Sequence, residues 1–157
     1  MSGRAQPGPV ARTEERFSFT VQAPLAAAFP LFGAWGEKAW AGDDWQPRFL
    51  HPDPPRDEAY AVFTVAHGPH EAVWVNTAFD LAAGRVQYVY VVPGVQAVVI
   101  DLALAEEDAR RTRVAVTYRR TALDPAMNER VREMAAHDRE NGPEWERLIA
   151  ARPGCVR

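Results

Sequence analysis

The fold class is decided by the stretch Arg85-Val-Gln-Tyr-Val-Tyr-Val-Val92, by the turn Pro93-Gly94 that follows it, and by the run from Val95 to Leu104. Apolar and polar residues alternate along both runs, which is the period of a β-strand with one buried face. Because Pro-Gly favours a tight turn, the two strands are expected to pair antiparallel. The middle of the chain is therefore predicted to be antiparallel sheet.

The same alternation extends the sheet in both directions along the chain. It predicts further strands at residues 16–21, 60–65, 71–79 and 113–118, and the short connections favour antiparallel pairing over crossovers. Trp74 is ambiguous, because Val73, Val75 and Phe79 form an equally apolar face of opposite parity. The side chains predicted to face inward are Phe63, Val86, Tyr88, Tyr90, Val92, Val98, Ile100, Leu102, Leu104, Val114, Val116 and Tyr118.

Helical patterns flank the strands. Two short helices are expected after the first strand, at residues 25–29 and 36–40, and one amphipathic segment is expected from Pro125 to Ala150. Asp138 falls in the middle of the apolar stripe of that segment. If the helix is straight, this carboxylate faces the sheet; if Asn141-Gly142-Pro143 breaks it into two helices, Asp138 lies in a frayed last turn and stays wet.

Length and composition indicate one globular domain. The 157 residues are 47% hydrophobic and 25% charged, which is ordinary for a chain that buries a single core. We expect a disordered N-terminal tail at residues 1–15, a domain at 16–152 and a C-terminal tail at 153–157. Cys155 is expected to be a bystander, and the absence of a signal peptide makes the cytoplasm the default location.

Charge and hydropathy exclude several partners. The net charge of -3 gives no cationic field for nucleic acid, and no apolar run approaches the roughly 20 residues of a membrane span. The Arg pairs at 110/111 and 119/120 are interpreted as a solvated rim, with phosphate binding as the less favoured alternative.

No catalytic or metal motif stands out. His67 and His70 bracket Gly-Pro in a predicted turn, where their side chains need not converge, and no further residues have the spacing of metal ligands. His137 is expected at the surface, and serine is too scarce for a serine nucleophile. We expect no metal and no cofactor.

The order of elements resembles the START-like, or SRPBCC (helix-grip), superfamily, which includes polyketide cyclase-like proteins. Locally, Gly36-Glu-Lys-Ala-Trp40, Trp45-Gln-Pro47, Phe49-Leu-His-Pro52 and Thr117-Tyr118 look like an uncharacterised bacterial branch of it. The resemblance implies an α+β fold, in which a seven-stranded antiparallel sheet curls around a long C-terminal helix with two short helices after the first strand. It also implies a cavity between sheet and helix that takes lipids, polyketides or other hydrophobic compounds.

Aromatic residues are the main candidates for lining such a cavity. Trp40 and Trp45 flank the flexible Ala-Gly-Asp-Asp linker, although clustered tryptophans more often pack a core. The tyrosine hydroxyls of the inward faces can orient a ligand or bond to one another. The predicted ligand-binding residues are Trp40, Trp45, Phe63, Trp74, Tyr88, Tyr90, Tyr118, Met134 and Asp138.

Three functions remain open from the sequence. The first is binding of a small hydrophobic molecule by a monomer or homodimer. The second is a cyclase or dehydratase in which Asp138 or a tyrosine moves protons. The third is a protein-interaction module similar to the co-chaperones of this fold, which predicts a filled interior beside an exposed apolar patch.

Overall fold

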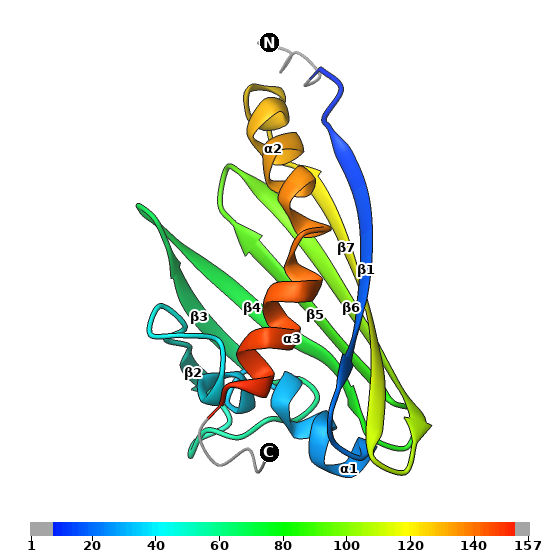
Figure 1. The fold of residues 1–157 in the computed structure, drawn as a ribbon. Helices are drawn as coiled ribbons and strands as arrows, with labels where there is room; N and C mark the ends of the chain where they lie inside the picture. Colours follow the sequence, from blue (N-terminus) through cyan, green and yellow to red (C-terminus); the bar gives the residue numbers. More distant parts are fainter. Residues whose placement is uncertain (1–7, 153–157) are drawn as a thin grey trace, which may run out of the picture.

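A computed structural model describes residues 8–152 of the chain (Figure 1). A single seven-stranded antiparallel sheet has the strand order β1-β7-β6-β5-β4-β3-β2. The strands are β1 (Arg12–Val21), β2 (Arg48–His51), β3 (Val62–His67), β4 (His70–Asp80), β5 (Arg85–Val92), β6 (Gln96–Asp108) and β7 (Arg111–Ala122). The helical elements are α1 (Leu25–Ala28), η1 (Phe29–Phe32), η2 (Gly36–Ala39), η3 (Pro125–Met127), α2 (Asn128–Asp138) and α3 (Asn141–Ala150).

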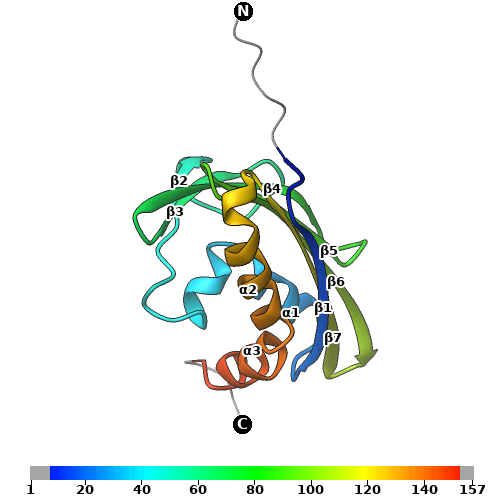
Figure 2. The same cartoon turned by 90° about the horizontal axis from the view of Figure 1, so that it is seen from above.

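All helices lie on the concave side of the curled sheet. Seen from above, the sheet wraps around α2 and α3, with the short segments that follow β1 beside them (Figure 2). The predicted architecture, a seven-stranded sheet gripping C-terminal helices with short helices after the first strand, is confirmed. The inward parity predicted for the three long strands is also confirmed, since the side chains of those sets on β5, β6 and β7 are all buried.

A β-bulge in β4 resolves the ambiguity at Trp74. Trp74 lies opposite Tyr90 and Phe79 lies opposite Val86, and the register shifts by one residue between Asn76 and Ala78. The extra residue reverses the parity of the strand. Trp74 and Phe79 therefore both pack on the core despite their odd spacing.

The C-terminal segment is two helices, not one straight helix. Helix α2 ends at Asp138, a turn occupies Arg139 and Glu140, and α3 begins at Asn141. Pro143 lies in the first turn of α3, where a missing N–H costs no helical hydrogen bond. The bend does not leave Asp138 in water, however, because its side chain is buried against the sheet.

One boundary and one short strand differ from the sequence expectation. β1 begins at Arg12, and residues 12–15 pair with β7. The predicted N-terminal tail at residues 1–15 therefore extends four residues too far. β2 is a four-residue edge strand in a segment with no alternating pattern. Residues 1–7 and 153–157, including Cys155, lie outside the described residues. No helix within residues 8–152 is long and apolar enough to cross a membrane.

Candidate functional site

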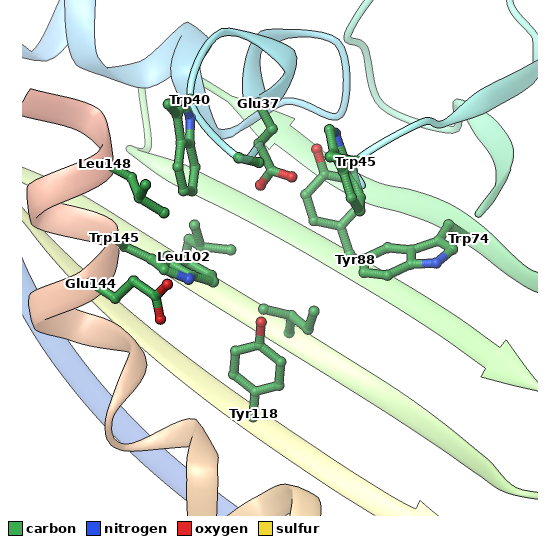
Figure 3. Close-up of a pocket in the computed structure, with 12 residues that line it drawn as sticks. Glu37, Trp40, Trp45, Trp74, Tyr88, Leu102, Tyr118, Glu144, Trp145 and Leu148 are labelled. Atoms are coloured by element: carbon green, nitrogen blue, oxygen red, sulfur yellow. The ribbon is translucent and has the colours of Figure 1, made fainter. Parts of the chain in front are cut away.

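A cavity of about 250 Å³ lies between the sheet, η2 and α3 (Figure 3). Two pairs of indole rings line it: the ring centroids of Trp40 and Trp145 are 5.5 Å apart, and those of Trp45 and Trp74 are 5.6 Å apart. Its complete lining is Glu37, Trp40, Ala41, Trp45, Trp74, Tyr88, Ile100, Leu102, Tyr118, Glu144, Trp145 and Leu148. Half of the lining residues are thus aromatic, and two are glutamates.

The position of η2 is fixed by Asp57 and by two glycines. The Asp57 carboxylate accepts hydrogen bonds from the backbone N–H groups of Trp35 and Gly36, at 2.8 and 2.9 Å. A Cβ atom at Gly36 would overlap the carbonyl oxygen of Pro30, and one at Gly33 would overlap the Asp57 carboxylate. The turn therefore packs closely on its surroundings, and this close packing carries the next residue, Glu37, into the cavity wall.

Carbonyl groups of η1 and of the link between η1 and η2 hold three aromatic side chains in place. Trp40 Nε1 donates to Leu31 O at 2.7 Å, Trp45 Nε1 donates to Ala34 O at 2.8 Å, and the Tyr88 hydroxyl donates to Phe32 O at 3.0 Å. Buried indole N–H and phenol groups need such partners. The indole N–H groups and the phenol hydroxyl are thus already hydrogen-bonded to the backbone, so these rings contact the cavity mainly through their apolar surface.

Glu37 is an acidic group whose pKa is strongly altered by its surroundings. Its side chain is half-buried and points into the cavity (Figure 3). Burial, and then the negative charge of Asp57, raise the pKa of the Glu37 carboxyl well above its ordinary value. Burial also raises the pKa of Asp57, against the two backbone hydrogen bonds that lower it. Glu37 is therefore poised to hold a proton at a pH where an exposed glutamate is ionised.

Glu144 and Tyr118 bring further polar atoms to the cavity. Glu144 lies at the exposed start of α3 with its carboxylate turned toward the cavity, and the Tyr118 hydroxyl points into it from β7 (Figure 3). Burial raises the pKa of Tyr118 well above its usual range, so the phenol keeps its proton. Unlike Tyr88, Tyr118 forms no side-chain hydrogen bond with the described residues. Of the predicted tyrosines, Tyr118 is the one whose hydroxyl is available to a ligand.

The structure brings five of the nine predicted site residues together. These are Trp40, Trp45, Trp74, Tyr88 and Tyr118.

Four predicted residues lie elsewhere. Phe63 packs behind the wall, stacked on Trp74 at 5.7 Å between centroids, and Tyr90 stacks on the same indole at 4.1 Å. Met134 and Asp138 lie on α2 and belong to a separate polar cluster with side chains of β5, β6 and β7.

That cluster is centred on a buried ion pair. Arg120 Nε and Nη2 donate to the two Asp138 carboxylate oxygens, at 2.8 and 2.7 Å, and Arg120 Nη1 donates to Tyr90 Oη and Gln96 Oε1, both at 3.1 Å. Gln96 Nε2 lies 3.3 Å from Met134 Sδ. The exposed fractions of Arg120 and Asp138 are 7% and 3%. The prediction of a solvated rim is thus wrong for Arg120, which shares the inward parity of Val116 and Tyr118.

The histidines do not form a metal site. His67 and His70 pair at the ends of β3 and β4, and burial lowers the pKa of His67. Within residues 8–152, no three His, Cys, Asp or Glu side chains gather closely enough to hold a metal ion. His137 is exposed and lies 3.5 Å from Glu140.

Comparison with known proteins shows the fold. No protein-family model and no curated protein sequence matches the chain. A truncated norcoclaurine synthase from Thalictrum flavum superposes with a TM-score of 0.65 at 9% identity, covering 92% of this chain and 94% of that one. Ara h 8.0201 gives 0.58 at 13% identity, over 90% and 95% of the two chains. This chain has the Bet v 1-like helix-grip fold.

A bacterial helix-grip structure is also similar. The Mll3558 protein from Rhizobium loti superposes with a TM-score of 0.61 at 15% identity, covering 92% of this chain and 99% of that one. These identities are low enough that the likeness concerns the SRPBCC-type fold and not the residues of the cavity.

Sequence reasoning missed the two carboxylates of the cavity. Glu37 lies in Gly36-Glu-Lys-Ala-Trp40, whose only signal is its resemblance to a family. Glu144 lies off the apolar stripe of its helix. No periodicity marks either residue, because η2 is a single turn placed by Asp57 from a distant loop. Trp145 falls on the apolar stripe of the C-terminal segment, a pattern that predicts packing against the sheet but does not distinguish core packing from contact with a ligand.

Proposed function

We propose that this protein binds a small hydrophobic compound in the cavity between the sheet and the C-terminal helices. The observation that supports this proposal most strongly is the lining itself, in which four indoles and two phenols surround about 250 Å³ of space. Concave, largely aromatic sites with a few polar groups are typical of ligand pockets. The sequence predicts the same function, and the cavity supplies a candidate set of lining residues for it.

The size of the cavity narrows the class of compound. A dry apolar cavity of about 150 Å³ accommodates benzene, whereas drug-sized ligands occupy roughly 300 to 1,000 Å³. A cavity of about 250 Å³ therefore suits one aromatic ring with a short side chain, or two small rings. A sterol or a long acyl chain would need the walls to move. One structural neighbour, norcoclaurine synthase, is described in complex with dopamine and hydroxybenzaldehyde, which are one-ring compounds of this size.

Filling the cavity tests the proposal. We would titrate 2-phenylethanol and 2-naphthol into the protein by calorimetry and repeat the titrations with Ala41→Phe, which places a ring in the lining. Ala39→Phe is the matched control, because Ala39 is exposed on the same turn and does not line this cavity. We expect Ala41→Phe to weaken binding at least about tenfold, or about 1.4 kcal/mol, and Ala39→Phe to leave it unchanged. Equal affinities for both variants, or no binding by the parent protein, would contradict the proposal.

A second candidate is a proton-transfer enzyme acting on a bound carbonyl compound. It is favoured by Glu37, whose raised pKa lets it keep a proton to donate, and by the free Tyr118 hydroxyl in the same cavity. Asp138, the residue expected to serve this purpose, is engaged with Arg120 instead. Glu37→Gln would abolish turnover of a carbonyl substrate while 2-phenylethanol still binds; turnover that survives this change would remove Glu37 from the role. The co-chaperone alternative would be favoured by a filled interior beside an exposed apolar patch, and the cavity leaves part of the interior unfilled.

A further inference from the structure

We propose that the compound bound in this cavity carries a positively charged nitrogen, and that the Glu37 and Glu144 carboxylates bind that nitrogen. This inference rests on the proposed function and adds the charge of the ligand to it. It concerns amines with about one aromatic ring, and it follows from the charges and ring systems that surround the space.

The cavity has two acidic side chains and no basic side chain to pair with them. Glu37 and Glu144 line it, and no Arg, Lys or His does. The ion pairs formed among residues 8–152 include neither carboxylate. Lys38, the nearest cation along the chain, lies over the Trp35 ring at 4.1 Å, and Trp35 is outside the lining. A carboxylate in a partly apolar site is stabilised when a cation arrives to pair with it.

The two carboxylates approach the same space from different elements. Glu37 descends from η2 and Glu144 projects from α3, and both carboxylates point toward the open centre of the lining (Figure 3). Glu37 is half-buried, whereas Glu144 is exposed. A cationic ligand in the cavity would therefore have one partly buried and one solvent-accessible carboxylate to pair with.

The aromatic walls favour the same charge. An ammonium group within about 6 Å of an aromatic centroid is attracted by the ring quadrupole, most strongly by tryptophan. The pairs Trp40–Trp145 and Trp45–Trp74 provide four indoles around the two carboxylates. Indole rings together with acidic side chains are the combination by which proteins recognise organic cations, and the rings also supply the apolar contact for the remainder of the ligand.

Compounds of other charge are matched poorly. A carboxylate or phosphate ligand would find no cationic side chain in the lining, and its charge would oppose the ionisation of both glutamates. The uncommitted donors of the lining include the Tyr118 hydroxyl and Trp74 Nε1, which are both neutral. The indole N–H groups of Trp40 and Trp45 are already bonded to backbone carbonyls. Like charges in a site of low polarity repel strongly, which makes the cavity selective against anions.

Amine binding is also coupled to a proton. Since burial raises the pKa of Glu37, its carboxyl keeps a proton to higher pH in the empty cavity, and a bound ammonium favours its ionised form. Affinity for an amine should therefore rise with pH until the amine itself loses its proton. The groups that face or adjoin Glu37 are Asp57, Tyr88, Tyr118 and Glu144, and the two tyrosines have pKa values raised by burial, so they stay neutral in that range.

Three probes of similar size separate the charge of the ligand from its shape. Phenethylamine, 2-phenylethanol and phenylacetate share a ring and a short chain, and carry a positive, neutral and negative end at pH 7.5. We would measure their affinities by calorimetry for the parent protein and for Glu37→Gln, Glu144→Gln and Glu133→Gln. Glu133 is exposed on α2 and outside the lining, so its variant controls for the change in net charge. Each variant's thermal melt shows whether it is folded.

The expected result is an order of affinity from amine to alcohol to carboxylate, with the amine at least about tenfold tighter than the alcohol. Glu37→Gln should weaken amine binding about tenfold, leave the alcohol unchanged and flatten the pH dependence, and Glu144→Gln should have a smaller effect of the same kind. Equal affinity for amine and alcohol, or an amine affinity insensitive to both variants, would overturn the inference while leaving the binding function intact. Binding of none of the three probes, and of no neutral ring compound, would remove the proposed function as well.

Discussion

Replacing Asp138 with leucine should destabilise the protein strongly without impairing the cavity. In the parent structure the Arg120 guanidinium is 7% exposed and donates two hydrogen bonds to the Asp138 carboxylate, at 2.7 and 2.8 Å. Asp138→Leu removes the negative partner and leaves a buried cation whose other acceptors, Tyr90 and Gln96, are neutral. The desolvation cost of the arginine is then no longer offset.

The magnitude follows from the general behaviour of buried pairs. Breaking such a pair from one side costs about 3 to 5 kcal/mol, whereas replacing both partners with apolar groups of similar volume is often neutral. Because Arg120 keeps two hydrogen bonds on Nη1, we expect about 3 kcal/mol for Asp138→Leu. The double variant Arg120→Met/Asp138→Leu should recover most of this loss. Against a total stability of roughly 5 to 15 kcal/mol, the single change is large.

Urea unfolding followed by tryptophan fluorescence measures both variants, and titration of 2-phenylethanol without urea measures the cavity. We expect a lower unfolding midpoint with unchanged affinity, because neither member of the pair lines the cavity. A variant as stable as the parent, or more stable, would refute the description of the pair as a mutually dependent buried contact. A folded variant that has lost ligand affinity would place Asp138 in the site after all.

Three further predictions concern the cavity wall. Gly36→Ala should lower both the melting temperature and the affinity for 2-phenylethanol, because its Cβ forces η2 to move; a melt and a titration that match the parent's would contradict this. Tyr88→Phe should cost about 1 to 2 kcal/mol of unfolding free energy, since it leaves a buried carbonyl without its donor, whereas Tyr118→Phe should cost much less; comparable losses in urea unfolding would show that both hydroxyls are bonded. Glu37, like Asp57, has a raised pKa in the folded state, so folding takes up protons and this contribution to stability is present at acid pH and lost as pH rises through the folded pKa. Glu37→Gln should therefore gain stability relative to the parent on going from pH 4 to pH 8, and a stability difference independent of pH would contradict the raised pKa.

The long strands could be predicted because their alternation is unbroken. β5, β6 and β7 carry their inward residues at strict period two, and pattern alone placed Tyr88 and Tyr118 on the concave face. β2 could not be predicted in this way, since four residues at a sheet edge with three exposed side chains carry no alternation. It was expected only through the resemblance to the helix-grip superfamily. The bulge in β4 explains why parity left Trp74 undecided.

The sequence contains the information needed to predict the Arg120–Asp138 ion pair, although neither pattern predicts it alone. Asp138 was recognised as a carboxylate on an apolar stripe, and Arg120 continues the inward parity of β7. The helical stripe places Asp138 on the inward face of its helix and the parity of β7 places Arg120 on the inward face of the sheet, so the two patterns together predict an ion pair. The interpretation of residues 119 and 120 as a solvated pair fits only Arg119, which is more exposed and pairs with Asp101.

The acidic residues of the cavity could not be predicted from the sequence. Glu37 faces the cavity because Asp57, twenty residues further along, binds the start of its turn and because glycines allow close packing there. Such placement depends on tertiary contacts between loops, which leave no periodic signal. The sequence could supply the aromatic walls of a site, but not the charge within it.

The central claim is that a ring-sized compound enters the space among four of the five tryptophans. The most direct test is a set of indole Nε1–H NMR signals recorded during titration with 2-phenylethanol and phenethylamine. We expect the signals of the four lining tryptophans (Trp40, Trp45, Trp74 and Trp145) to shift and saturate with one dissociation constant, and the signal of Trp35, which is 45% exposed and outside the lining, to stay in place. Four unmoved lining signals, or a shift confined to Trp35, would contradict the claim.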